Sequence, residues 1–134
     1  MKVLIADDDR DDWEFAALAF KEAGLHHTVS FAANGEELME QLGLLYSSTP
    51  DDLPDLILLD LNMPKKDGRL ALKEIRDDYR FQRLNVAIFS TTISEEDKAY
   101  TATLGVTRHI TKPFHFAELV QTIKEVCESY LVIS

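Results

Sequence analysis

Short apolar runs alternate along the chain with segments whose apolar residues recur every three or four positions. The runs predict β-strands, and the periodic segments predict amphipathic helices. The predicted strands are Val3–Ala6, Thr28–Ala32, Leu56–Leu59, Val86–Phe89 and Thr107–Thr111. The predicted helices span about 12–23, 36–45, 69–79, 94–104 and 116–131. Because a helix follows each strand, the pattern predicts an α/β fold with a parallel sheet covered by helices on both faces.

Capping residues and glycines mark the expected helix ends. Asp11 or Asp12 is expected to cap the first helix, and Gly24 to end it. The segment Ser94–Asp97 resembles a capping box. The segment Tyr46–Pro54 is expected to be an irregular loop because it is rich in proline and small polar residues. The positions expected to face the core are Trp13, Ala16, Ala17, Phe20, Leu38, Met39, Leu42, Leu72, Ile75, Tyr79, Phe116, Leu119, Val120, Ile123, Cys127, Tyr130 and Leu131.

Length and charge narrow the function classes. With 134 residues, the chain is expected to be a single domain, 1–134. Its 14 lysines and arginines stand against 24 aspartates and glutamates, a formal net charge of −10 that disfavours nucleic-acid binding. No apolar stretch is long enough to cross a membrane, and the amino terminus lacks a signal-peptide pattern. A lone Cys127 forms no internal disulfide, so a cytoplasmic location is expected.

Polar residues with metal-binding and catalytic potential follow four of the predicted strands. In chain order these residues are Asp7, Asp8, Asp9, Asp60, Asn62, Ser90, Thr91, Thr92, Lys112 and Pro113. Because the carboxyl ends of parallel strands share one edge of the sheet, these side chains are expected to converge. Crowded carboxylates are costly without a cation, and oxygen ligands suit Mg²⁺. The sequence therefore predicts a magnesium site.

Asp60 is the candidate nucleophile because it ends the most apolar strand. A carboxylate can accept a phosphoryl group when a metal ion and a cation hold the transferring oxygens. Ser90 can hydrogen-bond one phosphoryl oxygen, and Lys112 can offer a compact positive charge to another. A purely structural alternative treats Asp7–Asp9 as helix-capping residues and Lys112 as a surface lysine. That alternative leaves Asp60 unexplained.

Four motifs together resemble the receiver domain of two-component response regulators. They are IADDD, DLILLDLNMPKKDG, VAIFSTT and HITKPF, in that family's order and spacing. The resemblance runs from Val3 to about Ile133, almost the whole chain. It implies a flavodoxin-like five-stranded parallel sheet with strand order 2-1-3-4-5.

The resemblance also implies a metal-ligand set. Asp8 and Asp60 match carboxylates that bind Mg²⁺ directly, and Asp7 matches one that acts through water. Asn62 matches the residue that supplies a backbone carbonyl to the metal.

The remaining matched positions concern phosphoryl transfer and switching. Asp60 matches the phosphoacceptor, Ser90 the hydroxyl switch residue, and Lys112 the family's lysine. The Lys112–Pro113 peptide bond is expected to be cis by the same resemblance. His109 departs from the family, which commonly has Tyr or Phe there as a rotating switch. Either the imidazole switches in a pH-dependent manner, or it is a half-exposed residue with no switching role. The other histidines, His26, His27 and His115, are expected at the surface.

The resemblance implies a phosphoacceptor that assists its own phosphorylation and dephosphorylation, rather than a conventional enzyme. Its implied partners are a sensor histidine kinase or histidine phosphotransfer protein and an unidentified downstream protein, and a homodimer is left open. No output domain is expected after the last helix. The acidic first loop and the MPKKDG segment are similar to stand-alone receivers that work with bacteriophytochrome-type kinases.

Two alternatives belong to other function classes. A haloacid-dehalogenase-type phosphatase also uses an aspartyl nucleophile, Mg²⁺, a hydroxyl and a lysine, and Asp7–Asp9 contains its D-x-D pattern. That reading gives Asp60 no role, and no acidic pair follows Lys112 outside the last helix. The second alternative is a receiver-shaped binding module that works without phosphate, against which the complete acidic pocket argues.

Overall fold

Five parallel strands form one sheet in the order β2-β1-β3-β4-β5 in the computed structural model, which describes residues 1–24 and 28–131. The strands are β1 (Lys2–Ala6), β2 (Thr28–Ala32), β3 (Leu56–Leu59), β4 (Val86–Ser90) and β5 (His109–Thr111). The helices are α1 (Arg10–Glu22), α2 (Gly35–Ser48), the 3₁₀ turn η1 (Pro50–Asp52), α3 (Gly68–Asp77), α4 (Glu95–Thr103) and α5 (Phe116–Leu131). The flavodoxin-like order expected from the sequence is confirmed.

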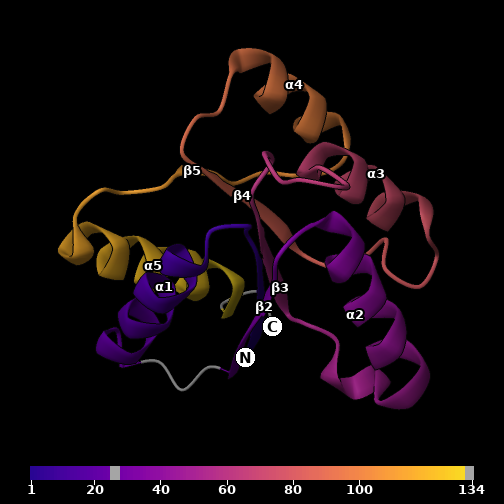
Figure 1. The fold of residues 1–134 in the computed structure, drawn as a ribbon, viewed down its shortest axis with the longest axis horizontal. Helices are drawn as coiled ribbons and strands as arrows, with labels where there is room; N and C mark the ends of the chain where they lie inside the picture. The colour runs from indigo at the N-terminus through magenta and orange to yellow at the C-terminus, as the bar shows by residue number, and fades with distance from the viewer. Residues whose placement is uncertain (25–27, 132–134) are drawn as a thin grey trace.

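Helices cover both faces of the sheet (Figure 1). α1 and α5 lie together over one face, while α2 and α3 lie over the other. Alternate residues of β1 enter the two cores: Val3 and Ile5 pack with α1 and α5, and Leu4 and Ala6 pack with α2 and α3. Since successive side chains of a strand point to opposite faces, burial on both sides requires an unbroken apolar run.

The first helix differs from the sequence-based expectation at its cap and on one face. Asp9, rather than Asp11 or Asp12, is the N-cap, because its side chain accepts a hydrogen bond from the Asp11 amide at 2.9 Å. Ala17 is exposed and Ala19 is fully buried, so the inward position assigned to Ala17 is wrong. Each helical step turns the side chain by about 100°, which carries residue 17 off the buried stripe.

Two further boundaries are corrected in the middle of the chain. The segment Tyr46–Pro54 is not an irregular loop, because α2 continues to Ser48 and η1 follows. The Ser47 hydroxyl donates to the Gly43 carbonyl at 3.1 Å, so this small polar residue stays within the helix. Pro50 occupies the first position of η1, where a missing N–H is tolerated. Because α3 ends at Asp77, Tyr79 lies outside it and is 78% exposed rather than inward.

Other local expectations are confirmed. The capping box at α4 is formed, with the Asp97 amide donating to the Ser94 hydroxyl at 3.0 Å and the Ser94 amide to the Asp97 carboxylate. Cys127 is buried, and burial raises the pKa of its thiol to about 11. His115 is exposed. The expectations for His26, His27 and the Leu131 side chain lie outside what the structure describes.

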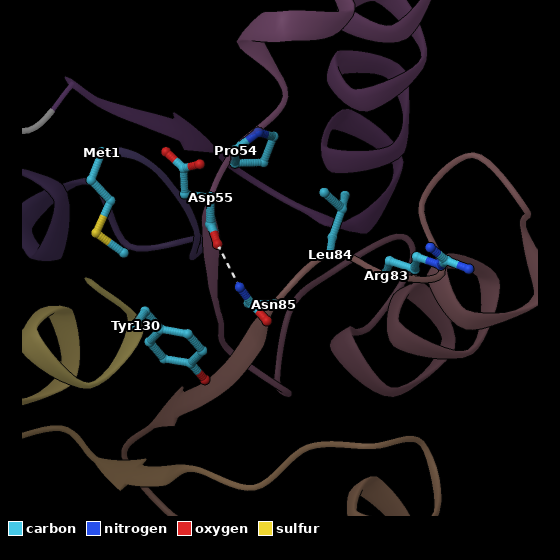
Figure 2. A pocket seen from close by; sticks show the side chains of 7 residues that line it. All are labelled: Met1, Pro54, Asp55, Arg83, Leu84, Asn85 and Tyr130. Carbon is cyan, nitrogen blue, oxygen red and sulfur yellow. Dashed lines mark hydrogen bonds between the residues drawn. The ribbon is translucent and has the colours of Figure 1, made fainter. Parts of the chain in front are cut away.

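A cavity of about 410 Å³ opens at the amino edge of the sheet, before β3 and β4 (Figure 2). Among the residues that line this cavity, the Asn85 side-chain amide donates to the Asp55 carbonyl at 3.1 Å. The cavity lies at the opposite edge from the residues that follow the strands, so it is separate from the chemistry expected from the sequence. Among the described residues, no helix is long and apolar enough to cross a membrane.

Candidate functional site

The carboxyl edge of the sheet brings together the side chains of Asp7, Asp60, Ser90 and Lys112. The ladders of hydrogen bonds continue past the strand ends: the Asp60 amide donates to the Ala6 carbonyl at 3.0 Å, and the Lys112 amide to the Ser90 carbonyl at 2.8 Å. These bonds hold the backbone of Asp60 and Lys112 at the carboxyl edge of the sheet, directly beyond the strand ends. The predicted convergence is therefore a direct consequence of parallel strand pairing.

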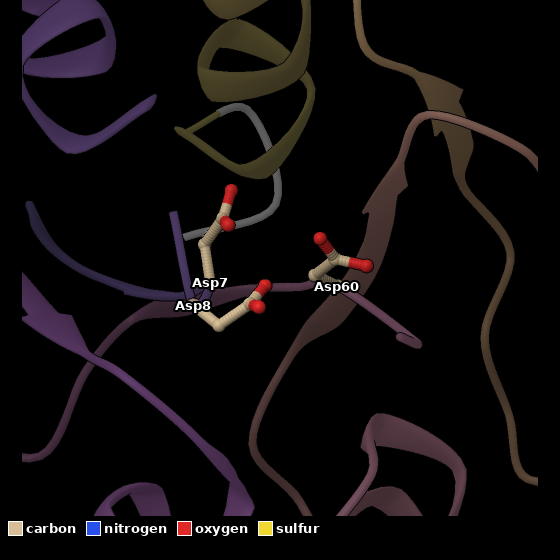
Figure 3. A group of neighbouring side chains, drawn as sticks. All are labelled: Asp7, Asp8 and Asp60. Carbon is tan, nitrogen blue, oxygen red and sulfur yellow. The ribbon is translucent and has the colours of Figure 1, made fainter. Parts of the chain in front are cut away.

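Three carboxylates form a group with the dimensions of a cation site. One oxygen each from Asp7, Asp8 and Asp60 lies within 4.8 Å of the other two (Figure 3). Asp7 and Asp60 are buried and Asp8 is exposed. Hard oxygen donors that are open to solvent on one side fit Mg²⁺, which retains several water ligands. The donor set therefore fits the ion that the sequence predicts.

Asn62 lies beside this group through its backbone. Its amide donates to Asp60 Oδ1 at 2.9 Å, and its side chain is exposed. The predicted role of the Asn62 carbonyl as a metal ligand stays a prediction.

Asp60 is held on both of its carboxylate oxygens. Oδ1 accepts hydrogen bonds from the Ser90 hydroxyl at 2.8 Å and from the Asn62 amide. Oδ2 accepts one from Lys112 Nζ at 2.9 Å. The hydroxyl oxygen of Ser90, which is fully buried, in turn accepts from the Leu61 amide at 2.9 Å. The Asp60 carboxylate is thus fixed in orientation and paired with a cation.

Lys112 lies between the carboxylates and is only 10% exposed. Its Nζ contacts Asp7 Oδ2 at 2.6 Å and Asp12 Oδ2 at 3.0 Å, in addition to Asp60. Burial alone disfavours the charged ammonium, but the hydrogen bonds to Asp7 and Asp60 outweigh it and raise the pKa of Lys112 above its usual value. Lys112 is therefore a permanent cation at this site.

The charged form of the Asp7 carboxyl group is disfavoured mainly by its burial. Burial raises its pKa to about 6, against the opposing effect of the hydrogen bonds from Lys112 and the Asp9 amide. The neighbouring charge of Asp12 also raises the pKa of Asp7. An additional cation at this place would favour the charged form of Asp7.

The segment after β3 closely approaches the backbone of Asp60. A Cβ atom at Gly68 would lie 2.2 Å from the Asp60 carbonyl oxygen, and the Gly68 amide donates to the Leu61 carbonyl at 3.0 Å. Lys65 has a positive φ of 62°, which turns the chain back toward α3. The glycine of the MPKKDG motif is therefore required by a close backbone approach beneath the candidate nucleophile.

One contact of Lys112 was missed by the sequence analysis, and one backbone expectation is wrong. Asp12 was interpreted only as a helix cap, although it stands five residues after Asp7 in the first turn of a helix that begins at this edge. The Lys112–Pro113 peptide bond is trans, not cis. The trans form is intrinsically favoured before proline by about 0.5–1 kcal/mol.

His109 lies outside the acidic group and contacts α4. Its Nε2 is 2.6 Å from the hydroxyl of Thr101, which is fully buried. The same hydroxyl lies 2.8 Å from the Asp97 carbonyl, so Thr101 links the imidazole of His109 to the backbone of α4. Burial, and then the charge of Lys98, lower the pKa of His109 below its usual value. His109 is therefore half-buried and tied to α4 rather than free in solvent.

The similarity of this chain to known proteins is consistent with the arrangement of these residues. Residues 3–124 match the family described as the response regulator receiver domain. The response regulator Rcp1 of Synechocystis sp. is 30% identical over 127 residues, 92% of this chain and 84% of that protein. The response regulator RR06 of Streptococcus pneumoniae is 34% identical over 134 residues, 99% of this chain and 56% of that longer protein.

Solved structures show the same architecture. The phosphorylated cyanobacterial phytochrome response regulator RcpA has a TM-score of 0.86 and 35% identity, covering 99% of this chain and 95% of that one. The Mn²⁺-bound form of Rcp1 has a TM-score of 0.80 and 29% identity, covering 93% of this chain and 90% of that one.

Proposed function

Because the chain belongs to the receiver-domain family of two-component response regulators, we propose that Asp60 accepts a phosphoryl group from a phosphohistidine, with Mg²⁺ bound beside it. The donor is a sensor histidine kinase or a histidine phosphotransfer protein. The observation that carries the proposal is the position of the Asp60 carboxylate, which is buried and held between the Ser90 hydroxyl and the Lys112 ammonium. RcpA is described as a phytochrome response regulator, which makes a bacteriophytochrome-type kinase the first donor to test.

In the transfer, a carboxylate oxygen of Asp60 attacks phosphorus, and the bond between phosphorus and the imidazole nitrogen breaks. The leaving imidazole nitrogen keeps the electron pair of the broken bond. The new oxygen–phosphorus bond makes Asp60 an acyl phosphate. The ammonium of Lys112 stabilises negative charge on the transferring oxygens, and the Ser90 hydroxyl is placed to donate to one of them. These groups assist the reaction without themselves being consumed, as expected for a phosphoacceptor that takes part in its own modification.

Asp7, Asp8 and Asp60, with the Asn62 carbonyl, are the residues that would hold the metal. When bound, Mg²⁺ supplies positive charge to the phosphoryl oxygens. The Rcp1 structure with Mn²⁺ supports a divalent cation in this family.

The proposed output is a conformational change on the side of the sheet formed by α4, β5 and α5. Ser90 ends β4, and β5 carries His109, whose imidazole is bonded to α4. A movement of the Ser90 hydroxyl toward the phosphoryl group removes its bond to the Leu61 amide and alters the packing beside β5. The altered surface would dock a downstream protein, or the phosphoryl group would pass onward.

The phosphatase alternative gains no support, because the matched family is the receiver domain and the buried, doubly held carboxylate is that of Asp60. The proposal is tested by incubating the protein with Mg²⁺ and acetyl phosphate and locating the added phosphoryl group by mass spectrometry. We expect one label, on Asp60, lost on addition of a chelator before the donor. Asp60→Asn should abolish it, and Asp11→Asn, a change of the same charge on an exposed residue, should retain it.

Three outcomes would contradict the proposal. Labelling that persists undiminished in the Asp60→Asn protein would move the phosphoacceptor elsewhere. Steady turnover of phosphate monoesters without a stable label would favour the phosphatase. A receiver-shaped module that acts without phosphate would show no label while still binding its partner equally with and without beryllofluoride.

A further inference from the structure

Lys112 has three carboxylate partners, and one of them has no place in the proposed phosphoryl transfer. Asp7 and Asp60 belong to the candidate metal group, whereas Asp12 does not. Asp12 Oδ2 nevertheless lies 3.0 Å from Lys112 Nζ, a hydrogen-bonding distance for an ion pair. The contact joins the first turn of α1 to the residue after β5, which are 100 positions apart in the chain.

The other two partners change during the proposed reaction. Asp60 becomes an acyl phosphate, and the Asp7 carboxylate is shared with a divalent cation. Both changes alter what these two groups offer the Lys112 ammonium, because phosphoryl oxygens replace the carboxylate charge of Asp60 and the charge of Asp7 is shared with the cation. Among the described carboxylates in contact with Lys112, Asp12 is the one that neither the metal nor the phosphoryl group engages.

Asp12 lies next to a residue that is held by two tertiary contacts. Its neighbour Trp13 donates from Nε1 to the Asp7 carbonyl at 2.7 Å and stacks on Phe31 with ring centroids 5.1 Å apart. The Asp12 side chain is 39% exposed, whereas the Lys112 side chain is 10% exposed. Asp12 therefore lies at the solvent-exposed rim of the site, and the Lys112 ammonium contacts it from the buried side. The Lys112 side chain is a flexible four-carbon stem whose ammonium has no preferred direction of its own, and a fixed anchor restricts it.

We propose that Asp12 is a positioning residue that keeps the Lys112 ammonium directed at Asp60 while the metal and the phosphoryl group engage its other partners. The proposal rests on the proposed function, because its effect is on phosphorylation of Asp60. A partly exposed ion pair contributes little to stability, so the expected consequence is on rate rather than on folding.

The test measures the rate of phosphorylation of the full chain by acetyl phosphate at saturating Mg²⁺ and saturating donor. Asp12→Asn is expected to lower this maximal rate by about two- to fivefold, the range that corresponds to a partly exposed ion pair. Asp12→Glu, which restores the charge, should recover most of the parent rate. Asp11→Asn is the matched control, since it removes the same charge from the same helical turn and is exposed.

The outcomes separate this proposal from the proposed function. Absence of an Asp60 label in the parent protein overturns both. A labelled parent with equal maximal rates for Asp12→Asn and Asp11→Asn overturns the positioning role alone. A higher rate in Asp12→Asn also overturns it, because Asp12 would then act as a repulsive charge at the rim. Equal shifts in the half-saturating Mg²⁺ concentration for both variants, with unchanged maximal rates, would assign Asp12 a general electrostatic effect and likewise overturn the positioning role.

Discussion

The guanidinium group of Arg69 in α3 binds both carboxylate oxygens of Asp97 in α4, at 2.7 Å from Nε and 2.9 Å from Nη2. A third hydrogen bond runs from Arg69 Nη1 to the Leu61 carbonyl, beside Asp60. Within α4, Thr101 is the buried residue, so little apolar surface holds this helix to the sheet. The bidentate pair therefore connects the segment after the candidate phosphoacceptor to a weakly packed helix.

The first prediction concerns this connection. Arg69→Lys removes the two-oxygen contact and should lower the free energy of unfolding by about 1 kcal/mol or less, since the pair is partly exposed. Hydrogen exchange over 95–103 should accelerate more than exchange elsewhere. Arg80→Lys is the control, because the ion pair of Arg80 is with Asp78, only two residues away, and does not involve α4. Unchanged exchange in α4 would show that its packing is independent of Arg69.

The second prediction compares two glycines. Gly68→Ala places a Cβ against the Asp60 carbonyl oxygen, a contact of 2.2 Å with backbone that cannot move aside easily. We expect a loss of about 1–3 kcal/mol in the free energy of unfolding and slower labelling of Asp60. Gly43→Ala, inside α2 with open space around the added atom, should raise stability by up to about 1 kcal/mol. Denaturant unfolding of both variants measures the difference, and equal effects would contradict the close approach beneath Asp60.

The third prediction concerns the metal site. Asp8→Asn removes a charged ligand and should weaken Mg²⁺ binding by roughly tenfold, together with a parallel loss of phosphorylation at low Mg²⁺. Binding can be followed by the fluorescence of Trp13, the single tryptophan, whose indole N–H contacts the Asp7 carbonyl. Because Asp8 is exposed, thermal stability without metal should stay close to that of the parent. An unchanged Mg²⁺ affinity, with Asp11→Asn as reference, would remove Asp8 from the ligand set.

The fourth prediction is the pH dependence caused by His109. Its pKa is lower in the folded protein than the ordinary 6.5, so the unfolded chain binds the proton more readily. The stabilising contribution of neutral His109 is therefore complete above pH 6.5 and is lost as the pH falls through the lowered pKa. His109→Gln should make the free energy of unfolding less dependent on pH between about 5 and 7.5, whereas His115→Gln, at an exposed position, should not.

The same histidine supplies a test of switching. If neutral His109 moves with α4 on activation, beryllofluoride should change hydrogen exchange over 94–111 more strongly above pH 6.5 than below the lowered pKa of His109. An equal exchange change in His109→Ala, with equal pH dependence, would leave His109 without a switching role.

The fifth prediction concerns the lifetime of the phosphoryl group. Asn62 and Thr92 are exposed and stand two residues beyond Asp60 and Ser90, where side chains can admit or exclude the attacking water. Replacing both by alanine should change the rate of phosphoryl loss by several-fold, measured by mass spectrometry after removal of the donor. Asn85→Ala, at the opposite edge of the sheet, is the control and should leave the lifetime unchanged. An unchanged lifetime in the double variant would mean that neither side chain controls water access.

Features that depend on one residue and its near neighbours could be predicted from the amino-acid sequence. The four apolar residues Leu56–Leu59 predict a strand buried on both faces, and Asp60 then emerges at its carboxyl end, as the structure confirms. The same reasoning placed Asp7, Ser90 and Lys112 at that edge, because every strand of a parallel sheet ends on the same side.

Contacts between residues far apart in the chain, and the ends of several helices, could not be predicted and became clear in the folded structure. No periodicity in the sequence of α1 distinguishes Asp12 from Asp11. What distinguishes Asp12 is its contact with Lys112, which follows β5 in the chain. Likewise, the binding of Arg69 to Asp97 depends on how α3 and α4 are set against each other. The expectation for Ala17 is wrong because the apolar pattern allows more than one helical stripe, and packing against the sheet selects one. The expectation for Tyr79 is wrong because α3 ends at Asp77, before that residue. Hydrophobic patterns indicate whether a position is buried. Whether two distant side chains touch depends in addition on the path that the chain follows between them.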